Sequence, residues 1–320
     1  MSMSNSVLSP VRRLLLTKGA TLGIATAFPS AFPILAKSAL LNTQTLEHAT
    51  MIEKQEMNFT THDGARIAYR KDGKGPALVL VHGTGGDGES NFAALTALLS
   101  DDYTVIRPDY AGSGATVDDG RALTVSYLAD QVLATMDALG VRKVHLLGFS
   151  LGAAIAAKIA ADHPDRVVSL ILLAGYASPD ARLKLEFELW RDLIARDRHA
   201  MARLVLLTGF SPDALASWGV DGVASAVEET LAGADWDGMA RQVDLDLRMD
   251  IQDILPRIEA PTLVTGCTHD HMVPPAHAKA LAVAIRNARY AELPTGHLAP
   301  MEQPDLLANQ VRAFLSGSSD

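Results

Sequence analysis

The sequence predicts an α/β fold, in which a doubly wound, mostly parallel sheet carries an inserted layer of helices. Three observations lead to this prediction. Short continuous apolar runs are bounded by turn residues, as in strands that are buried on both faces. Helical segments alternate with these runs. One long stretch, from about residue 179 to 256, has helical periodicity and no convincing strand.

The first 39 residues differ from the rest of the chain and are predicted to be an export signal. They contain the adjacent Arg12 and Arg13, then 18 uncharged residues from Gly19 to Ala36, and small residues that would allow cleavage after Ser38. The segment resembles a bacterial twin-arginine signal, so we expect a periplasmic or secreted protein. A membrane anchor remains an alternative, because these 18 uncharged residues nearly reach the length of about 20 that a membrane span needs. A cytoplasmic chain with a disordered tail is another.

Residues 40–54 are expected to form a polar linker, and the elements of the sheet follow it. The stretch EMNFTTHDGARIAYRKDG is typical of a hairpin with Asp63 and Gly64 in its turn. Further strands are predicted at ALVLVHG, YTVIRPD, KVHLLGF, VVSLILLAG and APTLVTG. Helices are predicted near residues 89–100, 124–139 and 151–162. The core is thus expected to comprise residues 55–178 and 257–320.

Residues 179–256 are predicted to form a helical cap. Helical spacing runs through ARLKLEFELWRDLIARDRHAMARLVLLTGF and again through DGVASAVEETLAGADWDGMARQVDL. The insertion follows the carboxyl end of a strand, which is where open sheets bind ligands. We therefore expect the cap to lie over the site.

Composition and charge narrow the classes of partner. The chain has 320 residues, a net charge of −9 and one cysteine, Cys267. Because residues 1–39 carry four basic residues and no acid, the remainder carries −9 − 4 = −13. This acidity argues against nucleic acid and anionic membranes as partners, so a small-molecule substrate is expected, without stable membrane contact after signal removal. A single cysteine excludes an intrachain disulfide and a multi-cysteine zinc site. The oligomeric state is left open.

Four strand ends supply residues suited to nucleophilic catalysis. HGTGG provides backbone N–H groups that could face a developing negative charge, and GFSLG places Ser150 on a sharp turn before a helix. Asp270 follows a later strand, and His297 lies before the last helix. The chain order of serine, acid and histidine is one of the recurring orders for a nucleophile, an orienting acid and a base.

HGTGG, GFSLG, the late Asp270 and GHLAPMEQP together resemble the α/β-hydrolase fold family, over residues 56–316. The region TLVTGCTHDHMVPPAHAKAL is similar to that of enol-lactonase-like and esterase-like members. The resemblance implies an eight-stranded sheet with Ser150 as nucleophile, His297 as base and Asp270 as orienting acid. It also implies an oxyanion hole formed by the N–H groups of Thr84 and Leu151. Cys267 stands where many members have glycine.

Other residues near these motifs have simpler expected roles. His82 is expected to be a hydrogen-bonded packing residue, Asp109 a turn former, and Cys267 a small buried apolar residue. His269, His271 and His277 surround Asp270 without helical metal-ligand spacing, so no metal is expected. Gly83 beside Thr84 and the aromatic residues of the cap are candidates for substrate binding, divided between pocket wall and core: Trp190, Phe210, Trp218 and Trp236.

The resulting expectation is a serine hydrolase that cleaves an ester or lactone of a small to medium, hydrophobic substrate without a cofactor. A carbon–carbon bond hydrolase, an acyltransferase or a cofactor-free lyase on the same fold remains an alternative. A non-catalytic ligand receptor is a further alternative.

Overall fold

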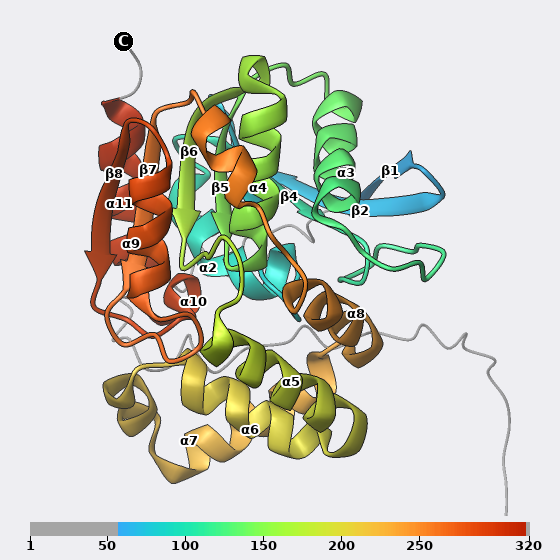
Figure 1. Cartoon of the computed structure of the whole chain (residues 1–320), viewed down its shortest axis with the longest axis vertical. Coiled ribbons are helices and arrows are strands. Elements are labelled where there is room, and N and C mark those ends of the chain that lie inside the picture. Colours follow the sequence, from blue (N-terminus) through green and yellow to red (C-terminus); the bar gives the residue numbers. More distant parts are fainter. Residues whose placement is uncertain (1–56, 318–320) are drawn as a thin grey trace, which may run out of the picture. The chain divides into compact units, whose positions relative to one another are not determined.

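The structure is a computed structural model that describes residues 57–317, and the predictions for the export signal and the linker lie outside these residues. Eight strands form one sheet in the order β1-β2-β4-β3-β5-β6-β7-β8 (Figure 1). The first strands are β1 (Asn58–His62), β2 (Ala65–Asp72), β3 (Ala77–Val81) and β4 (Thr104–Asp109). They are followed by β5 (Val144–Phe149), β6 (Val167–Leu173), β7 (Thr262–Cys267) and β8 (Ala288–Leu293).

The sheet is parallel except at the β1–β2 end. The hairpin β1–β2 turns through Asp63 and Gly64, both with positive φ, and β2 pairs antiparallel with β4. All other pairings are parallel. The doubly wound α/β fold and its mostly parallel, eight-stranded sheet are therefore confirmed, as is the hairpin.

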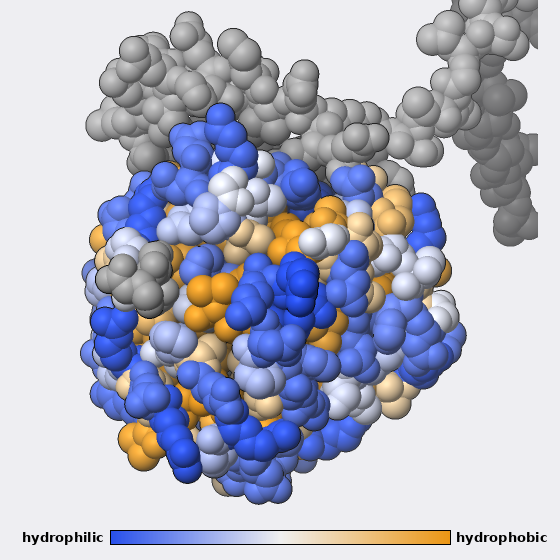
Figure 2. Space-filling model, turned by 90° about the horizontal axis from the view of Figure 1, so that it is seen from above, coloured by the Kyte–Doolittle hydropathy of each residue, from blue (hydrophilic) through white to orange (hydrophobic). Residues whose placement is uncertain are grey.

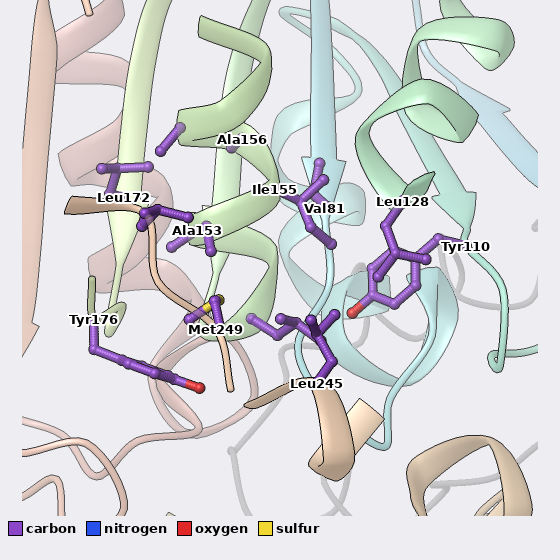
Figure 3. Close-up of a cluster of buried hydrophobic side chains, with 14 of the residues drawn as sticks. Val81, Tyr110, Leu128, Ala153, Ile155, Ala156, Leu172, Tyr176, Leu245 and Met249 are labelled. Carbon is purple, nitrogen blue, oxygen red and sulfur yellow. The ribbon is translucent and has the colours of Figure 1, made fainter. Parts of the chain in front are cut away.

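Helices cover both faces of the sheet because the central strands are apolar on both sides. On β3, Val79 and Val81 belong to one core cluster, whereas Leu78 and Leu80 belong to the other. The first cluster includes α3 (Val125–Ala138), α4 (Leu151–Asp162) and α9 (Pro275–Ala284). The second includes α2 (Gly88–Leu99) and α11 (Pro304–Ser316), which is preceded by the short α10 (Ala299–Glu302). Figure 3 shows part of the first cluster, where Ala153, Ile155 and Ala156 of α4 meet the strands.

Four helices lie between β6 and β7 in the chain: α5 (Ala181–Arg196), α6 (Arg198–Gly209), α7 (Pro212–Gly233) and α8 (Trp236–Asp246). Each begins with a side-chain cap, from Asp180, Asp197, Ser211 and Asp235 respectively. They gather beyond one end of the sheet (Figure 1). The 3-10 turns η2 (Pro164–Arg166) and η3 (Gln252–Arg257) precede β6 and β7.

The cap helices are shorter than the sequence periodicity indicates. The apolar pattern continues from α5 into α6, but the chain breaks at Asp197, which caps the second helix. Within α7, Gly219 has a φ of 67° and kinks the helix. These breaks let the chain change direction, so that α6 packs against both α5 and α7.

The face of the molecule opposite the cap mixes hydrophilic side chains with small, separate apolar areas (Figure 2). Among the described residues, no helix combines the length and apolar character that crossing a membrane would need.

Candidate active site

Ser150 stands between the end of β5 and the start of α4, in a backbone conformation that serine rarely adopts. Its φ is 55° and its ψ −120°. Its N–H donates to the carbonyl oxygen of Leu173 on β6, 2.9 Å away, and its own carbonyl accepts from the N–H of Ala153 at 2.9 Å. The bend is thus fixed from both sides, and the side chain is directed clear of the sheet.

Two glycines allow this bend. A Cβ on Gly148 would collide with the carbonyl of Gly152, and one on Gly152 would collide with the carbonyls of Val81 and His82. The start of α4 therefore passes directly against β3, as the GFSLG pattern requires.

The structure brings Ser150 together with the two other residues named from the sequence. The Nε2 atom of His297 lies 3.0 Å from the Oγ of Ser150, and its Nδ1 lies 2.7 Å from Oδ2 of Asp270. His297 is 4% exposed and Asp270 is 5% exposed. The three side chains form a hydrogen-bonded chain that is largely shielded from solvent.

Asp270 is held by its own loop, after β7. Its Oδ1 accepts hydrogen bonds from the N–H groups of Met272 at 2.9 Å and Val273 at 2.7 Å. This leaves Oδ2 for His297. Because Oδ1 of Asp270 accepts from two N–H groups and Oδ2 faces His297, we assign the proton to Nδ1 of His297, which leaves Nε2 free to accept the proton of Ser150.

The glycine-rich turn after β3 lies beside Ser150. A Cβ on Gly83 would come within 3.0 Å of the Cβ of Ser150. The N–H of Gly83 donates to Asn91 Oδ1 at 3.0 Å, and that of Gly85 donates to Gln242 Oε1 at 2.8 Å. Within residues 57–317, the N–H of Thr84 between them has no acceptor. The N–H of Leu151 is the first of α4, where helical N–H groups lack an acceptor within the helix.

A cavity of about 80 Å³ opens at Ser150. The predicted Gly83, Thr84 and Trp190 line it together with Ser150 and His297. Further lining residues come from the core and the cap: Gly85, Asn91, Phe149, Phe187, Val205, Thr230, Ala234, Trp236, Met239, Asp246, Met272, Val273 and Leu298. Most of this wall is apolar, as in sites that bind apolar parts of small molecules.

Phe210 and Trp218, predicted as substrate-binding residues, are not among the residues that line this cavity. Their rings pack against each other with centroids 4.6 Å apart, and Phe210 is 2% exposed. They therefore belong to the packing between α6 and α7, while Trp236 lies at the cavity.

Asp246, a buried acid in the cavity wall, was not predicted from the sequence. Its Oδ2 accepts from the Thr84 hydroxyl at 2.6 Å, and its Oδ1 accepts from the Tyr176 hydroxyl at 2.8 Å. Burial raises the pKa of Asp246 to about 7. Its place at the end of an otherwise ordinary amphipathic segment gave no sequence signal.

The residues assigned simpler roles lie near the site without joining the hydrogen-bonded chain. His82 is buried, stacks on Tyr110 with ring centroids 3.8 Å apart, and bonds to the Gly83 carbonyl through Nδ1 at 2.9 Å. Burial lowers its pKa to about 4, so the ring is neutral. Asp109 accepts from the N–H of Gly88 at 2.9 Å.

Cys267 is fully buried at the end of β7, and burial raises the pKa of its thiol to about 12. A thiol with such a pKa is a poor nucleophile. In the described part of the chain, no three histidine, cysteine, aspartate or glutamate residues are grouped so that they could hold a metal ion.

The sheet order, the turn at Ser150 and the acid and histidine after the later strands define an α/β hydrolase. The family model described as alpha/beta hydrolase fold matches residues 76–304, and the chain belongs to this family. Similar proteins carry the names of hydrolases, and this protein is likewise an enzyme of the hydrolase class.

Among similar proteins, a pyrrolizixenacetamide deacetylase from Xenorhabdus hominickii is 50% identical over 260 residues, which cover 81% of this chain and 98% of the relative. A putative carbamate hydrolase RutD from Pseudomonas savastanoi pv. phaseolicola is 29% identical, covering 76% of this chain and 95% of the relative. The crystal structure of the enol-lactonase from Burkholderia xenovorans LB400 has a TM-score of 0.74 and 28% identity, covering 81% of this chain and all of that one.

Proposed function

We propose that the protein is a serine hydrolase that cleaves an ester or lactone bond of a small to medium, apolar substrate through an acyl-enzyme. The observation that carries this proposal is the hydrogen-bonded chain from Ser150 Oγ through His297 to Asp270. A serine hydroxyl within hydrogen-bond distance of an imidazole whose other nitrogen contacts a buried carboxylate is the arrangement that activates a serine nucleophile.

In the proposed mechanism, Nε2 of His297 takes the proton of Ser150 as Oγ attacks the substrate carbonyl carbon. The N–H groups of Thr84 and Leu151 donate to the oxygen that becomes negative in the tetrahedral intermediate. His297 then protonates the leaving alcohol, and the acyl-enzyme remains. In the second half, His297 takes a proton from water as the water oxygen attacks the acyl carbon. The bond between that carbon and Ser150 Oγ then breaks, His297 returns the proton to Oγ, and the carboxylic acid leaves.

A second candidate is removal of an acetyl group from an amide. It is favoured by the 50% identity to a protein named a pyrrolizixenacetamide deacetylase. The same acyl-enzyme would form, with an amine instead of an alcohol as the leaving group. The cavity of about 80 Å³ beside Ser150 is compatible with an acyl group as small as acetyl.

Covalent labelling with a fluorophosphonate tests the mechanism. We expect label on Ser150, at a rate that falls in acid because only neutral imidazole can accept the proton. Ser150→Ala and His297→Ala should each lower kcat by several orders of magnitude, about 10⁴-fold or more, and the double variant should lose little more because the two residues act together. Asp270→Asn should retain somewhat more activity.

The substrate panel should pair p-nitrophenyl esters and lactones of increasing acyl length with matched N-acetyl amides. Turnover of the esters or lactones without turnover of the matched N-acetyl amides supports the first candidate. Turnover of the amides supports the second, because an amide is intrinsically much less reactive than a p-nitrophenyl ester. Folded Ser150→Ala protein with near-normal turnover would contradict both.

A further inference from the structure

The helix α8, within the inserted cap, presents one face to the glycine-rich turn after β3. Met239, Gln242 and Asp246 recur on this helix at intervals of three and four residues, which places them on one side. A Cβ on Gly85 would meet Met239 Sδ at 2.9 Å. The turn and the helix are thus in direct contact along this face.

Gln242 joins the turn to a second loop of the core. Its Oε1 accepts from the N–H of Gly85 at 2.8 Å, while its Nε2 donates to the carbonyl of Gly112 at 3.0 Å and to Ser113 Oγ at 2.7 Å. The side chain is fully buried. A buried amide with both ends bonded has little freedom, so the position of Gly85 is fixed relative to α8.

Asp246 holds the turn at the neighbouring residue. It accepts from the hydroxyl of Thr84 at 2.6 Å and from that of Tyr176, which follows β6, at 2.8 Å. Asp246 is 1% exposed and Tyr176 is also 1% exposed. Two consecutive residues of the turn, Thr84 and Gly85, are therefore bonded to side chains of α8.

The helix itself is anchored. Leu245 is buried in the first core cluster, where Figure 3 shows it between Tyr110 and Met249, and Arg241 forms an ion pair with Asp118 at 2.7 Å. Movement of α8 relative to the turn would break contacts with the core as well as the two hydrogen bonds to the turn. We therefore expect α8 to hold the glycine-rich turn in a fixed position.

We propose that α8 positions the oxyanion-binding N–H of Thr84, with Gln242 and Asp246 as positioning residues that act through Gly85 and the Thr84 hydroxyl. This inference rests on the proposed function, because it gives the Thr84 N–H its role there. It makes one helix of the cap part of the catalytic arrangement as well as part of the pocket wall. A misplaced donor loses transition-state stabilisation steeply with distance and angle.

The test compares hydrolysis of an oxoester with that of the corresponding thionoester in Gln242→Leu, Asp246→Ala and Thr84→Val. A thiocarbonyl sulfur accepts hydrogen bonds poorly, so an intact oxyanion hole favours the oxoester. Each variant leaves the Thr84 N–H in the chain but removes a contact that holds it. Thr84→Val removes the hydroxyl that bonds to Asp246, so it breaks this contact from the side of the turn and leaves the residues of α8 unchanged. Asp244→Ala, at an exposed position of the same helix, is the matched control.

We expect kcat for the oxoester to fall by about 10- to 100-fold in Gln242→Leu and Asp246→Ala, with a smaller change in KM. The thionoester should lose less, so the ratio of oxoester to thionoester turnover should fall. Thr84→Val should lower the ratio in the same direction, and Asp246→Asn, which keeps an oxygen for the Thr84 hydroxyl, should restore most of it. Asp244→Ala should keep the wild-type ratio.

A wild-type ratio in the three variants overturns the inference, whether or not their rates fall, because a loss of stability alone lowers turnover of both substrates equally. Should Asp246→Ala fail to fold by circular dichroism, Thr84→Val decides for that contact. Failure of the proposed function is distinct: it is seen as turnover that survives Ser150→Ala, whereas failure of this inference leaves that variant inactive.

Discussion

Ser150 carries backbone strain at the point where the proposed chemistry occurs. A positive φ with a ψ of −120° is a region that glycine enters freely and other residues enter at a cost of about 1–3 kcal/mol. The hydrogen bonds of its N–H and carbonyl to Leu173 and Ala153 hold the residue there. The strained conformation keeps Oγ exposed to the cavity beside His297.

The strain predicts an unusual order of stability for two substitutions. Ser150→Gly should melt at the same temperature as Ser150→Ala or above it, because glycine relieves the strain and this offsets its larger loss of chain entropy. Ser217, exposed on α7, provides the control. There glycine should be less stable than alanine by about 1 kcal/mol. Thermal melts of the four variants measure both differences, and the same order at both positions would contradict the strain.

At the residue scale, the sequence revealed the groups whose motifs have a fixed local geometry. Ser150 lies between glycines that are needed for close approach, and Asp270 and His297 follow strands, so their convergence could be predicted from the topology. Asp246 could not be found this way. Its role depends on which face of α8 meets the turn after β3, and helical periodicity marks a buried face without naming its neighbour.

The cap helix α5 bonds to the loop that holds Asp270. The Nη1 of Arg182 donates to the carbonyl of Met272 at 2.9 Å and to Glu186 at 2.9 Å, and its Nη2 donates to the carbonyl of His271. The N–H of Met272 in turn donates to Asp270. The cap thus contacts both halves of the site, through α5 at the acid loop and through α8 at the glycine turn.

Arg182→Met should loosen the Asp270 loop while keeping most of the aliphatic packing of the side chain. We expect kcat to fall by about 3- to 10-fold, since the Asp270 backbone contacts remain but lose their outer support. The effect should be modest because Arg182 is close to half exposed. Steady-state kinetics measure it, with Arg203→Met on the exposed face of α6 as the control. Equal kcat in both variants would show that the loop needs no support from α5.

At the element scale, the apolar runs located the central strands, but β8 was not assigned to a particular segment. Its sequence, ARYAEL, contains a charge at each end of a short apolar core, and several of its residues are only half-buried. An edge strand that pairs on one side only lacks the continuous apolar signal of the central strands. The order of the helices in the cap had no sequence signal either, because turns at Asp197 and Gly219 depend on packing.

At the scale of the whole molecule, burial raises the pKa of three carboxyl groups on separate elements of the described chain. Burial raises the pKa of Asp109, at the end of β4, to about 6, and the pKa values of Glu186 on α5 and Asp246 on α8 to about 7. Each group binds a proton in the folded protein at a pH where the unfolded chain has released it. The contribution of these groups to the free energy of unfolding therefore falls as the pH rises from about 4 to 7, because over this range the folded protein must hold protons on these groups that the unfolded chain has released.

Asp246→Asn isolates one of these contributions. Asparagine cannot ionise, so the variant should gain stability relative to wild type as the pH rises from 5 to 7, by up to about 1.4 kcal/mol per pH unit, and the gain should level off above that range. Thermal or urea unfolding at several pH values measures the difference. Asp244→Asn, which removes an exposed carboxylate from the same helix, is the matched control. A constant difference between Asp246→Asn and wild type across these pH values would mean that Asp246 ionises alike in the folded and unfolded chains, and that its burial between Thr84 and Tyr176 carries no charge penalty.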